Sequence, residues 1–96
     1  MWEYQVQGFD ERLNKWTIAH SPNIRVKATY TDLNRAMSLL DRIPQDWAEH
    51  IEMLKRSGLE TESTVKAMPK AYRIVSREVS DWYEMVIRGE DFEKVN

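Results

Sequence analysis

Apolar and polar residues alternate strictly along two segments of the chain. The first segment is Trp2-Glu3-Tyr4-Gln5-Val6-Gln7, and the second runs from Ile24 to Tyr30. Successive side chains of a β-strand point to opposite faces, so a period of two predicts a sheet with one buried and one solvated face. The pattern assigns seven residues to the buried side: Trp2, Tyr4, Val6, Ile24, Val26, Ala28 and Tyr30. It assigns six to the solvated side: Glu3, Gln5, Gln7, Arg25, Lys27 and Thr29.

A third strand is predicted between these two, over residues 15–20, with Trp16 and Ile18 pointing inward. Residues 8–14 carry Gly, Asp and Asn, which suit a turn, so the first two strands are expected to form a hairpin with a long loop. Ser21-Pro22-Asn23 then breaks the chain before the strand at residues 24–30.

Helical spacing begins after Tyr30. Thr31 is the expected N-cap, and apolar residues recur at intervals of three and four from Leu33 to Leu40. Pro44 suits a helix interior poorly, so one helix is predicted to end near Arg42 and a second to start near Pro44. A single kinked helix is the alternative. Gly58 is the expected C′ residue, just beyond the helix, with Leu59 closing a Schellman motif on Leu54. Residues 59–70 are expected to form a connector.

The segment 71–88 supports two interpretations. Its apolar residues follow a heptad-like spacing, which favours a helix, but β-branched and aromatic residues with a Ser80-Asp81 turn favour two strands, residues 72–79 and 82–87. We adopt the strands and expect the polar residues 89–96 to fray. The sequence thus predicts one α+β domain over residues 1–96, a two-layer fold with an antiparallel sheet of about four to five strands packed against one or two α-helices.

Composition limits the class of protein. The chain has 96 residues, 42% of them hydrophobic, which suffices for one core without metals or disulfides, and it has no cysteine. A formal net charge of −2 gives the whole molecule no strong preference for nucleic acid or anionic membranes. Neither a secretory signal nor an apolar stretch of about 18 residues is visible, which predicts a cytoplasmic protein without membrane association.

Signs of catalysis are few. With three glycines and no Gly-rich phosphate loop, nucleophile elbow or HExxH motif, the sequence predicts a non-enzymatic protein without a cofactor. Asp46 and His50 are spaced to share a helix face and could both reach a metal, and His20 or His50 could act as a base. A small enzyme or metal-binding protein is therefore the second alternative. Glu78, Asp81 and Glu84 form an acidic cluster typical of a solvated turn.

Four basic residues form the candidate site for a partner or for phosphate: Arg25, Lys27, Arg73 and Arg77. The first two point outward from the predicted strand at residues 24–30, and the others share one face of the strand at residues 72–79. If the two strands are neighbours, one sheet face carries all four cations and could bind nucleic acid or an acidic partner. The competing interpretation is that exposed strands carry such residues for solubility.

A second candidate surface lies on the helices. Trp47, Met37 and Met53 are residue types common at adaptable interfaces, although most such side chains are expected in the core. Small sheets with exposed edges often dimerise, so a homodimer through the Leu33–Leu54 region is a candidate assembly.

The two ends of the chain resemble small uncharacterised proteins of phages and prophages. The similarity covers Trp2-Glu3-Tyr4-Gln5-Val6 and the residues from Tyr72 to Trp82, under a third of the chain. It implies an accessory protein that works by binding a host factor or nucleic acid, and it assigns no site residues. The lack of catalytic motifs in a small, aromatic-rich chain without cysteine makes a non-enzymatic protein-binding module the leading hypothesis, and the resemblance implies a phage-encoded, inhibitory one. A nucleic-acid-binding module is the first alternative.

Overall fold

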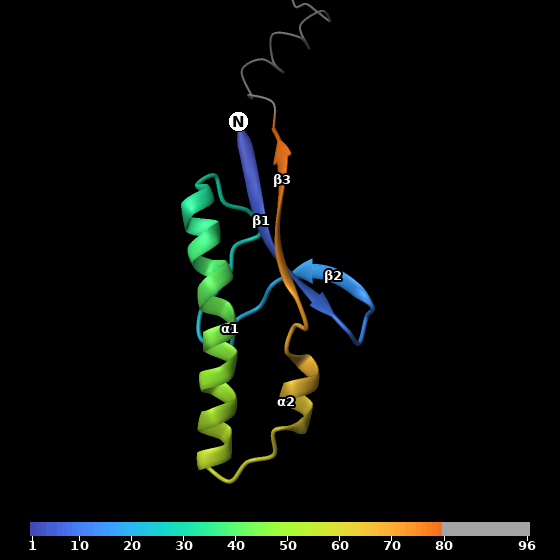
Figure 1. Ribbon diagram of the computed structural model, residues 1–96, viewed down its shortest axis with the longest axis vertical. Helices are drawn as coiled ribbons and strands as arrows, with labels where there is room; N and C mark the ends of the chain where they lie inside the picture. Colours follow the sequence, from blue (N-terminus) through green and yellow to red (C-terminus); the bar gives the residue numbers. More distant parts are fainter. Residues whose placement is uncertain (80–96) are drawn as a thin grey trace, which may run out of the picture.

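The computed structural model describes residues 1–79. It contains five elements: β1 (Trp2–Asp10), β2 (Lys15–Ile18), α1 (Leu33–Arg56), α2 (Glu62–Ala67) and β3 (Tyr72–Glu78). Figure 1 shows α1 running alongside β1 and β3, with α2 just before β3 along the chain. The predicted α+β class with an antiparallel sheet is confirmed, and of the one or two helices expected the structure has one main helix. The expected strand at residues 82–87 and the frayed tail at 89–96 lie outside the described residues.

The sheet has three strands in the order β2-β1-β3, where about four to five were expected for the chain. β1 is the central strand: residues 2–8 pair antiparallel with β3, and residues 7–10 pair antiparallel with β2. The first and last described strands are therefore neighbours. Within residues 1–79, no helix combines the length and the apolar character needed to cross a membrane.

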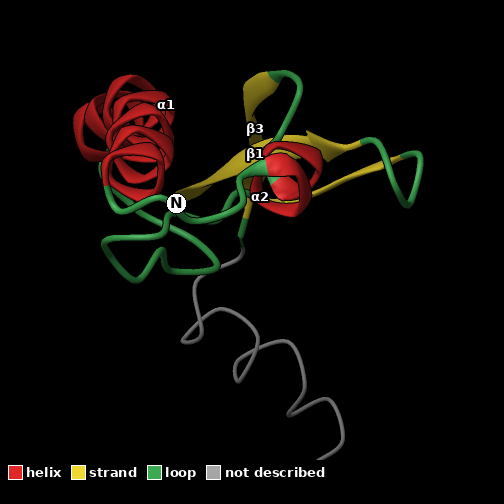
Figure 2. Cartoon of the chain, turned by 90° about the horizontal axis from the view of Figure 1, so that it is seen from below, coloured by secondary structure: helices red, strands yellow, loops and turns green. Residues whose placement is uncertain are grey.

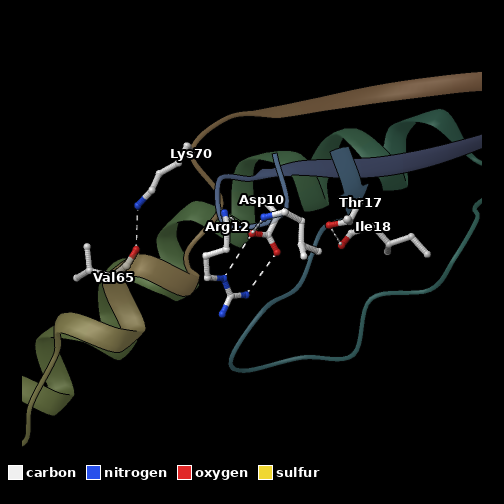
Figure 3. Close-up of polar contacts among 7 residues, drawn as sticks. Asp10, Arg12, Thr17, Ile18, Val65 and Lys70 are labelled. Atoms are coloured by element: carbon white, nitrogen blue, oxygen red, sulfur yellow. Dashed lines mark hydrogen bonds and ion pairs between the residues drawn. The ribbon is translucent and has the colours of Figure 1, made fainter. Parts of the chain in front are cut away.

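The turn between β1 and β2 is shorter than predicted, because β1 continues to Asp10. One oxygen of the Asp10 carboxylate accepts hydrogen bonds from the backbone N–H groups of Arg12 (2.9 Å) and Leu13 (3.3 Å). The Arg12 guanidinium lies 3.4 Å from the other oxygen (Figure 3). Asn14 adopts φ 55°, a left-handed conformation that Asn tolerates well. A side chain also stabilises the connection between α2 and β3, where the Lys70 ammonium donates a hydrogen bond to the Val65 carbonyl at 2.9 Å (Figure 3).

Residues 24–30 do not form the predicted strand. They follow an irregular path, and only Tyr30 pairs with the sheet, through reciprocal backbone hydrogen bonds with Tyr4 of 2.7 and 2.8 Å. The prediction fails because β2 already occupies that edge of β1 at residues 7–10. The alternation in exposure survives in part, since Ile24 and Val26 are half-buried while Arg25 and Lys27 are exposed.

The predicted division into two helices is wrong: α1 is one continuous helix that passes through Pro44, as the single-helix alternative expected. A proline removes one backbone hydrogen bond, and burial of Ile43 and Trp47 on either side of it compensates for that loss. Asp32, and not Thr31, is the N-cap; its carboxylate accepts the Asn34 N–H at 2.9 Å.

The C-terminal end of α1 is confirmed as a Schellman motif. The Leu59 N–H donates to the Leu54 carbonyl at 2.9 Å, and the Gly58 N–H donates to the Lys55 carbonyl at 3.0 Å. Gly58 has φ 73°, the left-handed conformation that favours glycine at this position. The predicted connector that follows contains the short helix α2.

The core lies between the sheet and α1. Figure 2, which views α1 close to end-on, shows this helix set to one side of the sheet. The cluster of buried apolar side chains comprises Val6, Ala19, Ala36, Ile43 and Trp47, with Tyr4, Tyr72 and Ile74 packed against it. The Trp47 indole N–H donates to the His20 carbonyl at 2.7 Å, which satisfies the one polar atom of this side chain.

Four residues predicted to be inside are elsewhere. Trp16 and Ile18 pair with Phe9 and Gln7, so they share the sheet face opposite Val6. The register of a four-residue strand is determined by its turn, and the alternation within β2 alone does not indicate which of its faces meets the core. Trp2 is 51% exposed at the end of β1, and Ala28 is exposed in the irregular segment.

Candidate anion-binding pocket

A recess of about 320 Å³ lies between residues 24–30 and α1, and basic side chains dominate its lining. Arg25 and Lys27 come from the irregular segment, and Arg35 and Arg42 come from α1. We call these four residues and the space between them the basic pocket. The remaining lining residues are Ile24, Tyr30, Ser38 and Leu39, so the lining carries no acidic side chain from the part of the chain that the structure describes.

Hydrogen bonds hold the irregular wall of the basic pocket. The Tyr30 backbone is paired with Tyr4 in β1, and the Tyr30 hydroxyl oxygen accepts the Lys27 backbone N–H at 2.9 Å. At the other end of the segment, the Ser21 hydroxyl oxygen accepts the N–H groups of Asn23 (3.1 Å) and Ile24 (3.3 Å). The wall that carries Arg25 and Lys27 is thus fixed at both ends, although it belongs to no helix or strand.

A buried carboxylate ties the two walls together. Asp46, on α1, is 5% exposed; it accepts the Ser21 hydroxyl proton at 2.8 Å and lies 3.4 Å from the Arg42 guanidinium. Burial of a charge is costly unless it is hydrogen-bonded and paired, and Asp46 meets both conditions. Asp46 therefore contacts both Arg42, which lines the basic pocket, and Ser21, which lies in the turn before the irregular wall.

Charge in the basic pocket is largely uncompensated. Among residues 1–79, Arg42 is the one member of the four with a carboxylate within 4.0 Å. Arg25, Lys27 and Arg35 are exposed and have no such partner within that part of the chain. Like charges gathered within a Debye length of about 8–10 Å repel one another, so an anion that enters the recess relieves this repulsion.

Arg35 and Arg42 were missed by the sequence reasoning. They are seven residues apart on α1, which is about two helical turns and hence one face. This spacing could have indicated that the two arginines share a helix face. Exposed arginines are common on helices, however, and only the folded structure shows that this face lies beside Arg25 and Lys27.

The structure separates the four basic residues predicted as one site. β1 lies between β3 and Tyr30, because Tyr4 pairs with Ser76 along one edge and with Tyr30 along the other. Arg25 and Lys27 line the basic pocket, whereas Arg73 and Arg77 lie on β3.

Arg73 and Arg77 are engaged within the sheet. The Arg77 guanidinium lies 3.0 Å from the Glu3 carboxylate. Arg73 donates to the Gln7 side chain at 2.8 Å and stacks 4.2 Å above the Trp16 ring. A face with four free cations is therefore not formed.

The three helical residues predicted as an interface do not form one patch. Trp47 is 9% exposed and belongs to the core. Met37 and Met53 are 49% and 42% exposed, but their separation of 16 residues places them about 160° apart around α1.

The predicted metal pair is also engaged elsewhere. Asp46 holds Ser21 and Arg42, and the His50 ring packs edge-on against Trp47 with 6.5 Å between ring centroids. Across residues 1–79, no three His, Cys, Asp or Glu side chains converge as metal ligands would.

Comparison with known proteins identifies no relative whose function could guide the interpretation of the basic pocket. No family model matches the chain. Curated proteins and solved structures also give no significant match. The resemblance of the chain ends to phage and prophage proteins therefore stays a prediction, and the basic pocket is interpreted from its own chemistry.

Proposed function

We propose that this protein is a non-enzymatic binding module that recognises an acidic segment of a protein partner through the basic pocket. The observation that supports this function is the convergence of Arg25 and Lys27 with Arg35 and Arg42 in one recess. The chain as a whole carries a net charge of −2, so this positive charge is local. Local charge of this kind steers and selects a partner of opposite sign.

A nucleic-acid-binding function has weaker support. Proteins that bind duplex DNA commonly neutralise about 6–10 phosphates, and single-strand binders add aromatic platforms for the bases. The basic pocket offers four cations in one recess, and its single aromatic residue, Tyr30, is buried. Arg73 and Arg77, which the sequence predicted to contact phosphate, already contact Gln7 and Glu3, respectively.

The test is a binding measurement with a charge-reversed protein. The full chain is titrated into a fluorescein-labelled polyglutamate peptide, and fluorescence anisotropy gives the dissociation constant. Arg25→Glu/Arg35→Glu is the test variant, and Lys15→Glu/Lys55→Glu is a control with the same change in net charge away from the pocket. An exposed ion pair is worth about 0.2–1 kcal/mol, and reversal also adds repulsion, so we expect affinity to fall about tenfold or more.

Four results decide the outcome. Loss of affinity in the test variant but not in the control supports the proposal, and so does weakening of wild-type binding by salt. Equal affinity in both variants refutes it. Tighter binding of a single-stranded oligothymidylate, abolished by the same test variant, would replace the protein partner with nucleic acid.

A further inference from the structure

We propose that the acidic group recognised by the basic pocket is a phosphorylated side chain of the partner rather than a carboxylate. This inference rests on the proposed function, because it specifies the ligand of the same pocket. Three of the four cations lack an ion-pair partner within residues 1–79. A phosphoryl group carries about −1.5 to −2 at neutral pH, whereas a carboxylate carries one charge, so a phosphoryl group matches the uncompensated charge more closely.

The donors that line the pocket also favour a phosphoryl group. Three of the four cations are arginines, whose planar guanidinium groups bind phosphate oxygens in a bidentate manner. Two residues with hydroxyl groups, Ser38 and Tyr30, line the same recess. The Tyr30 oxygen accepts the Lys27 N–H, and a phenol that accepts one hydrogen bond can still donate its own proton. A phosphoryl group presents three acceptor oxygens to these donors and a carboxylate presents two.

The arrangement on α1 suits one compact anion. Arg35 and Arg42 are about 10 Å apart along the helix axis, with Ser38 between them on neighbouring turns. Arg25 and Lys27 face them from the opposite wall. Asp46 lies 3.4 Å from the Arg42 guanidinium and is not among the residues that line the recess, so the lining itself presents no carboxylate to an incoming anion.

The experiment compares three peptides that differ at one position. Their central residue is Ser, Glu or phosphoserine, the flanking residues are Gly and Ala, and each peptide is titrated into the isotopically labelled full chain. Backbone amide shifts in two-dimensional NMR give both the affinity and the location of binding at constant ionic strength. We expect the phosphoserine peptide to shift amides in residues 24–30 and 35–42, and to bind about tenfold more tightly than the Glu peptide.

Three variants complete the design. Arg25→Glu/Arg35→Glu is expected to abolish phosphoserine binding, and Lys15→Glu/Lys55→Glu is expected to retain it. Ser38→Ala is expected to weaken binding of the phosphoserine peptide more than binding of the Glu peptide. The variant removes one hydroxyl donor, and the phosphoryl group has a third acceptor oxygen that a carboxylate lacks. The NMR spectrum of each variant verifies its fold.

The outcomes separate this inference from the proposed function. Equal affinity for the Glu and phosphoserine peptides, both lost on charge reversal, overturns the phosphoryl inference and leaves the acidic-partner function standing. Absence of shifts in the pocket with any acidic peptide overturns both. If inorganic phosphate binds more tightly than the phosphoserine peptide, the ligand is the free anion. If oligothymidylate does so, the ligand is nucleic acid, and either result overturns the inference.

Discussion

Gly8→Ala tests how tightly the link between α2 and β3 packs on the central strand. Gly8 is buried in β1, paired with Thr17 on one side and Tyr72 on the other. A Cβ atom added to Gly8 would lie 2.8 Å from the Pro69 Cβ and 3.0 Å from its Cγ. Carbon atoms pack best at about 3.5–4.0 Å, so the proline ring must retreat by roughly 0.5–1 Å.

The size of the effect follows from two opposing contributions. Overpacking of this kind costs about 1–3 kcal/mol. Replacing glycine by alanine at an ordinary backbone conformation returns about 0.4–1 kcal/mol, because the unfolded chain loses conformational freedom. The clash involves a ring that cannot change rotamer, so we expect it to prevail and the free energy of unfolding to fall by about 1–2 kcal/mol.

Urea unfolding followed by tryptophan fluorescence measures this change. The matched control is the same substitution in a Pro69→Gly background, where the clashing ring is absent. A double-mutant cycle should show that Gly8→Ala is neutral or stabilising there, with a coupling energy of about 1–3 kcal/mol between the two positions. If Gly8→Ala is at least as stable as the wild type in the native background, the close contact with Pro69 does not constrain β1 and the reasoning is wrong.

Two further predictions concern the core and the hairpin turn. Ile43→Ala should lower the free energy of unfolding by about 2–5 kcal/mol, because Ile43 is fully buried; the half-exposed Met37→Ala should stay within about 0.5 kcal/mol, and similar losses at both positions in urea unfolding would contradict this. The Arg12 side chain, through its hydrogen bond, is the main cause that lowers the pKa of Asp10 below 3.8, so Arg12→Ala should raise that pKa in an NMR titration. Because the folded-state pKa lies below the unfolded value, the stabilisation is complete above the unfolded pKa and disappears as pH falls through the folded one. An unchanged Asp10 pKa in the Arg12 variant would assign the shift to the turn backbone instead.

Two strands were predicted from local signals. β1 alternates strictly, whereas the segment that contains β3 also has a heptad-like spacing, and its β-branched and aromatic residues decided the choice of a strand. The two strands pair along most of their length. The Schellman motif at the end of α1 was also predictable, because Gly58 and Leu59 follow Leu54 at the required spacing. These features depend on residues close together in the sequence.

The parts that were not predictable depend on competition between distant segments. Residues 24–30 alternate as well as β1 does, but β2 occupies the edge they would need. Pro44 indicates a helix end by its own chemistry, and only the burial of Ile43 and Trp47 makes a continuous α1 favourable. Arg35 and Arg42 line the basic pocket because α1 lies beside the segment that carries Arg25 and Lys27, and no local sequence pattern indicates that neighbourhood.

The absence of the predicted strand at residues 24–30 and the presence of the basic pocket have the same physical origin. Had residues 24–30 paired with β1 in the register of Tyr30 with Tyr4, Arg25 and Lys27 would stand opposite Phe9 and Gln7, on the sheet face away from α1. The irregular path turns them toward Arg35 and Arg42 instead. Hydrogen bonds of Ser21 and Tyr30 replace the missing ladder, so the free protein already holds this wall in place, and a ligand need not supply the cost of ordering it. Departures from local pattern that are stabilised in this way are expected where a chain builds a binding site.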